Sequence, residues 1–91
     1  MRQVDRAEFN IKLQEAQRFA IASNTELDTK KLWNCADPKN ASNPRIRFYE
    51  IGYHWDGAYR LMFRQVNPLT PESTFFMDED EVMLFEARMA Q

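Results

Sequence analysis

The 91-residue sequence predicts an α+β domain, with a helix near each end and an antiparallel β-hairpin between them. Apolar residues recur at helical spacing after Asp5 and again after Asp78. Between these segments, two runs rich in aromatic and β-branched residues flank the dipeptide Asp56-Gly57. The content of 44% hydrophobic and 29% charged residues is typical of a globular chain. We therefore expect residues 1–91 to form a single small domain.

The first helix is expected to begin at about residue 6. Asp5 and Glu8 have the spacing of a capping box, which satisfies the free amides of a first helical turn. The residues that follow form one apolar stripe, made of Phe9, Leu13, Ala16 and Ala20. Ser23-Asn24 predicts the end of the helix, because Asn tolerates the left-handed conformation of a C-terminal cap.

A second, short helix is expected next. Thr25 and Asp28 have the spacing of a helix cap. The apolar residues of this helix would be Leu27, Leu32 and Trp33. Residues 34–44 are turn formers that include two prolines, which predicts a loop.

The hairpin is expected to pair residues 45–55 with residues 58–66 through a two-residue type I′ turn at Asp56-Gly57. A turn of this length predicts the cross-strand register. The predicted pairs on one face are Trp55 with Ala58, Tyr53 with Arg60, Ile51 with Met62, Tyr49 with Arg64 and Arg47 with Val66. The opposite face would carry Ile46, Phe48, Glu50, Gly52 and His54 together with Tyr59, Leu61, Phe63 and Gln65.

The second of these faces holds more aliphatic and Phe residues, so we expect the helices to pack on it. The first face would then meet solvent. It carries what we call the aromatic–arginine set, which consists of Arg47, Tyr49, Tyr53, Trp55, Arg60 and Arg64.

Three interpretations of the aromatic–arginine set remain open. Trp, Tyr and Arg dominate the binding energy of protein interfaces, which favours a protein-binding site. Aromatic rings also stack on bases while arginines meet phosphates, as in single-strand nucleic-acid binding. The third interpretation is purely structural: an outer sheet face whose rings and guanidinium groups cover one another. The net charge of −2 favours a protein partner over nucleic acid.

The segment after the hairpin contains Pro68 and Pro71 and must leave the sheet, because proline donates no hydrogen bond to a ladder. Thr70-Pro71-Glu72 could open a helical turn, or Thr74–Met77 could form a third, short edge strand, and the sequence leaves both open. A bond such as Asn67-Pro68 can exchange slowly between cis and trans in flexible segments. Pro68 is therefore a rigid turn residue or, alternatively, a slow conformational switch that contacts a host prolyl isomerase.

The last helix is expected over residues 79–90. Asp78 and Glu81 form its capping box, and Val82, Phe85 and Met89 lie on one face. The acidic run Asp78-Glu79-Asp80-Glu81 fits a helix N-terminus better than a cation site, whose ligands need wider spacing and a turn glycine.

No catalytic constellation is visible in the sequence, so we do not expect an enzyme. His54 is the only histidine and Cys35 the only cysteine, and Cys35 has no base near it in sequence. We expect no metal site, no cofactor and no disulfide. The chain has no apolar segment of the length of a signal peptide or membrane span, which predicts a cytoplasmic protein that does not bind membranes.

Two segments carry a resemblance to a known family. They are Met1-Arg2-Gln3-Val4-Asp5-Arg6-Ala7-Glu8-Phe9 and Phe63-Arg64-Gln65-Val66-Asn67-Pro68-Leu69-Thr70-Pro71. With them, most of the chain resembles the small anti-RecBCD, recombination-accessory proteins of lambdoid phages. The resemblance implies a non-catalytic protein that binds the host RecBCD helicase–nuclease, through its RecC subunit, and modifies its action. It carries over no catalytic residue, and the segment around Pro68 is similar to the family's proline-bearing loop.

The residues agree with a phage protein that binds and inhibits or modulates a host defence nuclease. The expected partner contacts are the aromatic–arginine set, that is Arg47, Tyr49, Tyr53, Trp55, Arg60 and Arg64. An inhibitor of another host defence complex, such as a CRISPR complex, fits the same features. A single-strand nucleic-acid-binding module that uses the same face of the hairpin is the further alternative.

Overall fold

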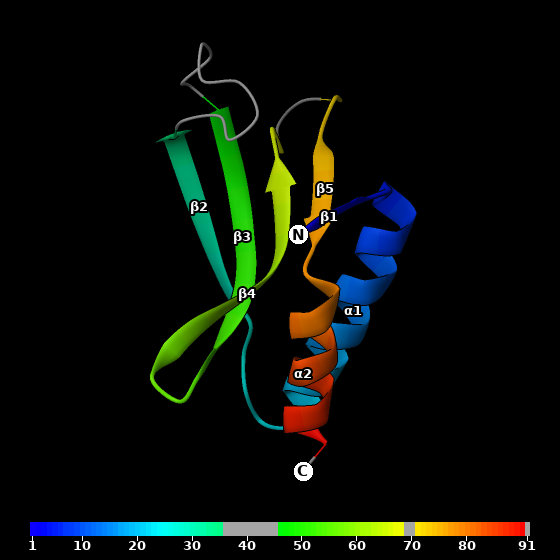
Figure 1. Ribbon diagram of the computed structural model, residues 1–91, viewed down its shortest axis with the longest axis vertical. Helices are drawn as coiled ribbons and strands as arrows, with labels where there is room; N and C mark the ends of the chain where they lie inside the picture. Colours follow the sequence, from blue (N-terminus) through cyan, green and yellow to red (C-terminus); the bar gives the residue numbers. More distant parts are fainter. Residues whose placement is uncertain (36–45, 69–70, 91) are drawn as a thin grey trace.

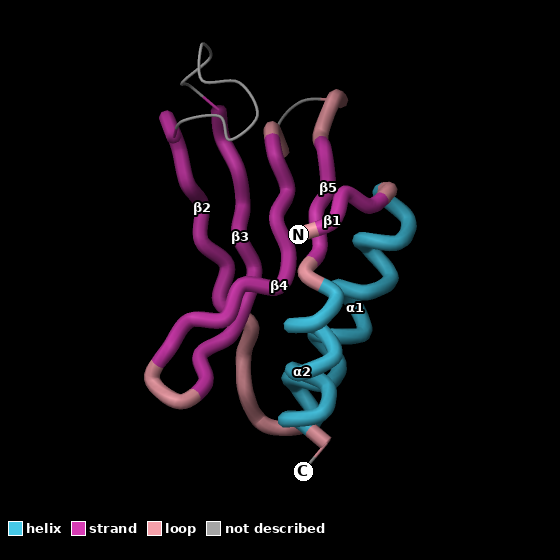
Figure 2. Tube along the Cα trace, in the orientation of Figure 1, coloured by secondary structure: helices cyan, strands magenta, loops and turns pink. Residues whose placement is uncertain are grey.

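The computed structural model of the protein describes residues 1–35, 46–68 and 71–90. The elements found in these residues, in chain order, are β1 (Arg2–Val4), α1 (Arg6–Ala22), β2 (Asp28–Cys35), β3 (Ile46–Trp55), β4 (Ala58–Val66), β5 (Thr74–Met77) and α2 (Glu79–Met89). The strands form one antiparallel sheet in the order β1-β5-β4-β3-β2. The two helices lie side by side near the β5 and β1 end of this sheet (Figures 1 and 2). The predicted α+β class is confirmed.

Helix α1 begins and ends where the sequence predicts. The carboxylate of Asp5 accepts a hydrogen bond from the amide of Glu8 at 2.7 Å, which caps the first turn. Asn24, just past the helix, has a φ of 55°, the left-handed conformation that stops the chain from continuing as a helix. The buried residues of the helix are Phe9, Ala16 and Ala20, so the predicted apolar stripe is the one that packs on the core.

Helix α2 also follows its prediction. The carboxylate of Asp78 accepts a hydrogen bond from the amide of Glu81 at 3.0 Å, and Val82 and Phe85 are buried. The acidic run at its start thus belongs to the capped first turn, where the helix dipole favours negative charge. The helix ends at Met89, one residue before the predicted end.

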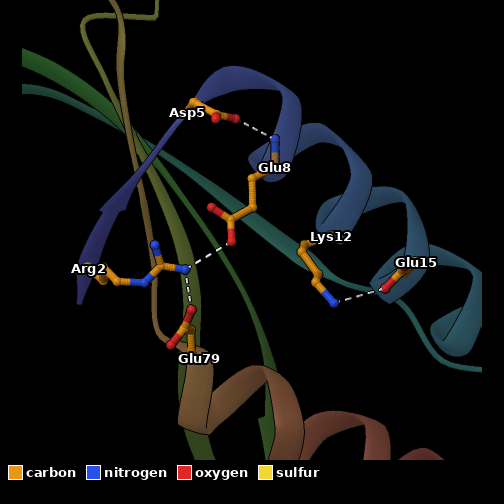
Figure 3. Close-up of polar contacts among 6 residues, drawn as sticks. All are labelled: Arg2, Asp5, Glu8, Lys12, Glu15 and Glu79. Carbon is orange, nitrogen blue, oxygen red and sulfur yellow. Dashed lines mark hydrogen bonds and ion pairs between the residues drawn. The ribbon is translucent and has the colours of Figure 1, made fainter.

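Polar contacts tie the two helices together at both ends. The guanidinium of Arg2 on β1 donates hydrogen bonds to Glu8 in the first turn of α1, at 2.9 Å, and to Glu79 in the first turn of α2 (Figure 3). At the other end, the hydroxyl of Ser23 donates to the carbonyl of Met89 at 2.9 Å. The helices therefore run in the same direction, with their N-termini joined through the first strand of the sheet.

The predicted second helix is wrong. Residues Asp28–Cys35, which include Leu32 and Trp33, form strand β2 and pair with β3. The cap-like spacing of Thr25 and Asp28 is overridden because β2 gains a hydrogen-bonded ladder with β3, regular from Asp28 to Leu32, which an isolated short helix could not match. Residues 34 and 35 thus belong to a strand, and the rest of the predicted 34–44 loop lies outside the described residues.

Of the two alternatives for the segment after the hairpin, a helical turn or a short strand, the structure shows the strand. Thr74–Met77 forms β5, which pairs with β4 on one side and with β1 on the other. It is therefore an inner strand and not the edge strand that the sequence suggests. The sequence does not predict β1, a strand of only three residues that occupies the edge instead.

Side chains alternate between two sides of the sheet, which we call the helix-facing side and the open side. The main core lies between the sheet and the helices and includes Phe9, Ile51, Phe63, Phe75 and Phe85. Phe48, Val66 and Phe76 form a second, smaller cluster on the open side. None of the described helices is long and apolar enough to cross a membrane.

Candidate binding surface

The turn of the hairpin is the one predicted. Asp56 and Gly57 have φ values of 52° and 75°, as a type I′ turn requires at both central positions. The first pairs after the turn, Trp55 with Ala58 and Tyr53 with Arg60, are also as predicted.

The register then shifts by one residue at a β-bulge. Gly52 pairs with Leu61 and Ile51 pairs with Phe63, so Met62 is the extra residue on β4. The freed carbonyl of Met62 accepts a hydrogen bond from the amide of Asp78 at 2.8 Å, just where α2 begins. The bulge thus both bends the hairpin and anchors the cap of the last helix.

The bulge overturns the prediction of which face meets solvent. Past the bulge, Phe63 lies on the same side of the sheet as Ile51 and Tyr53, and the helices pack against these three residues. Tyr53 is only 2% exposed, and Trp55 is half-buried and packs against the core. The expectation that both residues lie on a solvent-exposed outer face is therefore wrong.

Tyr53 instead belongs to a polar cluster beneath α2. Its hydroxyl donates a hydrogen bond to Glu81 at 2.7 Å and accepts one from Arg88 at 2.5 Å. Arg88 also pairs with Glu81 at 3.2 Å and lies over the ring of Trp55 at 5.2 Å. Burial, reinforced by the hydrogen bond to Glu81, raises the pKa of Tyr53. This cluster holds the hairpin to α2.

The two predicted arginines of β4 lie on different sides of the sheet. Arg60 is half-buried opposite Tyr53, hence on the helix-facing side. Arg64 is opposite Glu50 on the open side, with 3.6 Å between its guanidinium and the Glu50 carboxylate, and it covers the ring of Phe48 at 5.2 Å. The bulge separates them, so the aromatic–arginine set does not form one surface.

Arg47 and Tyr49 are the members of the set that lie on the helix-facing side but away from the helices. They alternate with Ile51 along β3 and so share its side of the sheet, but the helices pack mainly on β4 and β5, away from the first part of β3 (Figure 1). Arg47 is exposed and Tyr49 half-buried. Lys31 on β2 pairs with Tyr49 across the ladder, and its ammonium lies 5.9 Å from the centre of that ring.

A groove of about 330 Å³ continues this surface toward the end of α1. Its lining residues are Gln17, Ala20, Ile21, Thr25, Glu26, Leu27, Thr29 and Ile51. It opens between the last turns of α1, the chain that leads into β2, and the first residues of β2 and the middle of β3. We call this groove, together with Lys31, Arg47 and Tyr49, the uncovered surface.

The open side carries a second group of aromatic and charged residues. The ammonium of Lys30 lies 3.8 Å from the ring centre of Tyr59, and the ring of His54 lies 5.4 Å from it. Burial, together with the carboxylates of Glu50 and Asp28, raises the pKa of Tyr59 to about 12. This group contains both charge signs, so it offers no strong attraction to an anionic ligand.

The remaining candidates show ordinary structural contacts. The imidazole of His54 lies 3.0 Å from the Asp28 carboxylate; the His54 side chain is largely exposed and that of Asp28 partly exposed. In the part of the chain that the structure describes, no group of three or more histidines, cysteines and acids could hold a metal ion. The side chain of Cys35 lies outside the described residues.

Pro68 follows a residue that hydrogen bonds hold in place. Asn67 has a φ of 53°, its amide donates to the carbonyl of Arg47 at 2.7 Å, and its carbonyl accepts from the hydroxyl of Ser73 at 2.7 Å. The Asn67–Pro68 bond is trans. This geometry supports the rigid-turn interpretation of Pro68.

Sequence reasoning missed Lys31, because it assigned residue 31 to a helix. It also missed Arg2 and Arg88, which organise the helices. The only signal for Arg88 is its place in the last turn of an amphipathic helix, where a cation is favourable.

Comparison with known proteins identifies no relative. No family model, no curated protein and no solved structure matches this chain.

Proposed function

We propose that this chain is a non-catalytic protein that binds a host defence nuclease through the uncovered surface and inhibits or modulates it. The partner that the sequence resemblance implies is RecBCD. The observation that carries the proposal is the position of Tyr49 and Lys31 beside the groove, on the part of the helix-facing side that lies away from the main contacts of the two described helices.

This surface has the composition of a protein-binding site. A half-buried aromatic ring with a cation over it is the kind of rigid anchor that dominates interface energies. The groove next to it, whose lining is half apolar and half polar, supplies area that a partner side chain can fill. Arg47 adds a further exposed cation at the rim.

The proposed contacts are accordingly narrower than the aromatic–arginine set. Tyr49 and Arg47 stay as partner contacts, and Lys31 joins them. Tyr53 and Trp55 contact α2 through Glu81 and Arg88 and stabilise the fold there. Arg60 is half-buried, and its buried Nε has no hydrogen-bond partner among the described residues. Arg64 lies on the open side.

The test is the binding of the purified chain to purified RecBCD, measured by biolayer interferometry together with degradation of linear duplex DNA. We expect stoichiometric binding and a change in nuclease activity. Tyr49→Ala should weaken binding about 30-fold, which corresponds to the roughly 2 kcal/mol of an interface hot spot. Ile11→Ala is the matched control, because Ile11 is a large apolar residue that is 57% exposed on α1, away from the uncovered surface.

Two results would contradict the proposal. Absence of binding to RecBCD would remove the proposed partner, and the same assay with a CRISPR effector complex would then test the other defence complex. Equal binding by wild type and Tyr49→Ala would remove the proposed surface.

Single-strand nucleic-acid binding is a second candidate, because the neighbouring rings of His54 and Tyr59 on the open side are of the kind that stack on bases. Lys30 is the cation of this group, and Asp28 and Glu50 offset its attraction to phosphate. If this candidate held, oligonucleotide affinity would fall with salt, with a slope of about −0.7 per phosphate contacted on a log–log plot. Lys30→Ala would lower that slope, whereas Tyr49→Ala would not change it.

A further inference from the structure

Among the described strands, β2 is the longer of the two edge strands of the sheet. The strand order ends in β1 on one side and β2 on the other. β1 has three residues, while β2 has eight. An edge strand of that length presents a row of backbone amides and carbonyls to which another extended segment can pair.

The groove lies directly beside this edge. Thr29 of β2 and Leu27 just before it line the groove, and Ile21 of α1 forms its far rim with 77% of its surface exposed. A strand added to β2 would therefore place one side chain, on the helix-facing side, at the level of Thr29, where Ile21, Leu27 and Ile51 supply apolar contacts and the other lining residues include Glu26.

Two residues further along β2, on the same side of the sheet, the surface carries a positive charge. Lys31 follows Thr29 at the strand period, so both side chains lie on the helix-facing side. Lys31 is exposed, and its described contact is the ring of Tyr49. Neither Lys30 nor Lys31 forms an ion pair with a carboxylate anywhere in residues 1–35, 46–68 and 71–90.

We propose that β2 binds an extended segment of a partner protein by strand addition, and that this segment carries an apolar residue and an acidic residue two positions apart. The apolar side chain enters the groove beside Thr29. The carboxylate meets Lys31. Backbone hydrogen bonds supply affinity, and the two side chains supply specificity. This inference rests on the proposed function, because it specifies the chemistry of the segment by which the proposed protein partner binds.

A second copy of the chain fits this edge less well. Pairing two β2 strands side by side in antiparallel fashion would bring Lys30 and Lys31 of one copy close to the same lysines of the other. Like charges opposed across a ladder are destabilising, and lysines on edge strands discourage pairing between copies. An acidic segment turns the same lysines into an attraction.

The experiment uses a capped peptide of threonines with a central Leu-Thr-Glu, added to the isotopically labelled 91-residue chain and followed by amide NMR. We expect the largest shifts at residues 28–31. A peptide with Lys in place of Glu should bind at least tenfold more weakly. Lys31→Glu should lose at least tenfold in affinity for the acidic peptide, and Lys31→Gln should lose less.

Lys12→Glu is the control variant. It makes the same change in net charge on the surface of α1, where Lys12 pairs with Glu15 at 3.5 Å. We expect it to bind the peptide as wild type does. Circular dichroism of each variant checks that the fold is kept.

Three outcomes would overturn the inference. They are an absence of shifts at β2, equal affinity for the acidic and basic peptides, and self-association of the chain through β2 in the absence of peptide. The peptide assay does not involve RecBCD. A chain that takes the peptide at β2 but ignores RecBCD would refute the proposed partner alone, and a chain that binds RecBCD without using β2 would refute this inference alone.

Discussion

A methyl group added at Gly52 would lie 2.1 Å from the backbone carbonyl oxygen of Arg60. No side chain fits at that distance, so only glycine permits the two strands to approach each other as they do. The close approach lies at the β-bulge, where the register of β3 and β4 shifts by one residue. Through the bulge, Gly52 decides which side of the sheet each later residue of the hairpin occupies.

Gly52→Ala should therefore destabilise the fold by about 3 kcal/mol or more, because the added atom meets backbone that cannot rotate away. Gly57→Ala is the matched control. Gly57 has a φ of 75° but open space around its added methyl group, so it should lose only about 1 kcal/mol from backbone strain. Urea unfolding of both variants measures the difference, and equal losses would mean that the close approach is not needed.

Tyr53→Phe should destabilise the protein by about 1–2 kcal/mol. The substitution removes the hydroxyl that links Glu81 to Arg88 in a half-buried site, leaving their hydrogen bonds incomplete. Tyr49→Phe should change the unfolding free energy by less than about 0.5 kcal/mol, since its ring lies at the surface. A larger loss in Tyr49→Phe than in Tyr53→Phe would contradict the placement of these two tyrosines.

Alkaline pH should destabilise the fold partly through Tyr59. The folded state holds the pKa of Tyr59 at about 12, whereas the unfolded value is 10.0. Between these values the unfolded chain loses the phenol proton while the folded chain keeps it, so this contribution to stability is present below pH 10 and is lost as the pH rises toward about 12. Tyr53 also has a raised pKa, so the titration is done in a Tyr53→Phe background. Absorbance titration of the phenolates should then show a late-ionising tyrosine that is missing in the Tyr53→Phe/Tyr59→Phe double variant. Its persistence in that variant would assign it to another tyrosine.

Pro68 should give a single set of NMR signals in the folded protein. The amide and carbonyl of Asn67 are both hydrogen-bonded within the fold, to Arg47 and Ser73, which fixes the chain on the N-terminal side of the bond. Addition of a prolyl isomerase should leave the spectrum unchanged. Two sets of signals that the isomerase interconverts faster would instead support the switch interpretation of Pro68.

The sequence predicts those parts of the fold that depend on neighbours in the chain. Capping boxes locate the starts of α1 and α2, and Asp56-Gly57 locates the hairpin turn and its first pairs. The bulge at Gly52 escapes this reasoning because the need for glycine comes from the Arg60 carbonyl of the facing strand. Strand β2 escapes it because Thr25 and Asp28 imitate a cap, and only the ladder with β3 makes the strand the better solution.

The missed bulge and the missed strand β2 also make the predicted set of site residues partly wrong. If the register set by the turn continued unchanged along the hairpin, Tyr53 and Trp55 would share a solvent-facing side with Arg64. The one-residue shift at the bulge places Arg64 on the opposite side of the sheet. Tyr49 and Arg47 keep their place because they lie on the part of β3 that the helices do not reach. Lys31 could be recognised as their neighbour only once β2 was known to be a strand.

The central proposal is that the bulge buries Tyr53 and leaves Tyr49 on the surface to which the partner binds. Hydroxyl-radical footprinting of the chain, alone and with RecBCD, tests both halves at once. We predict that Tyr53 resists labelling in both samples, while Tyr49 is labelled in the free chain and protected in the complex. Labelling of Tyr53 in the free chain, or protection of Tyr59 in place of Tyr49 on binding, would contradict it.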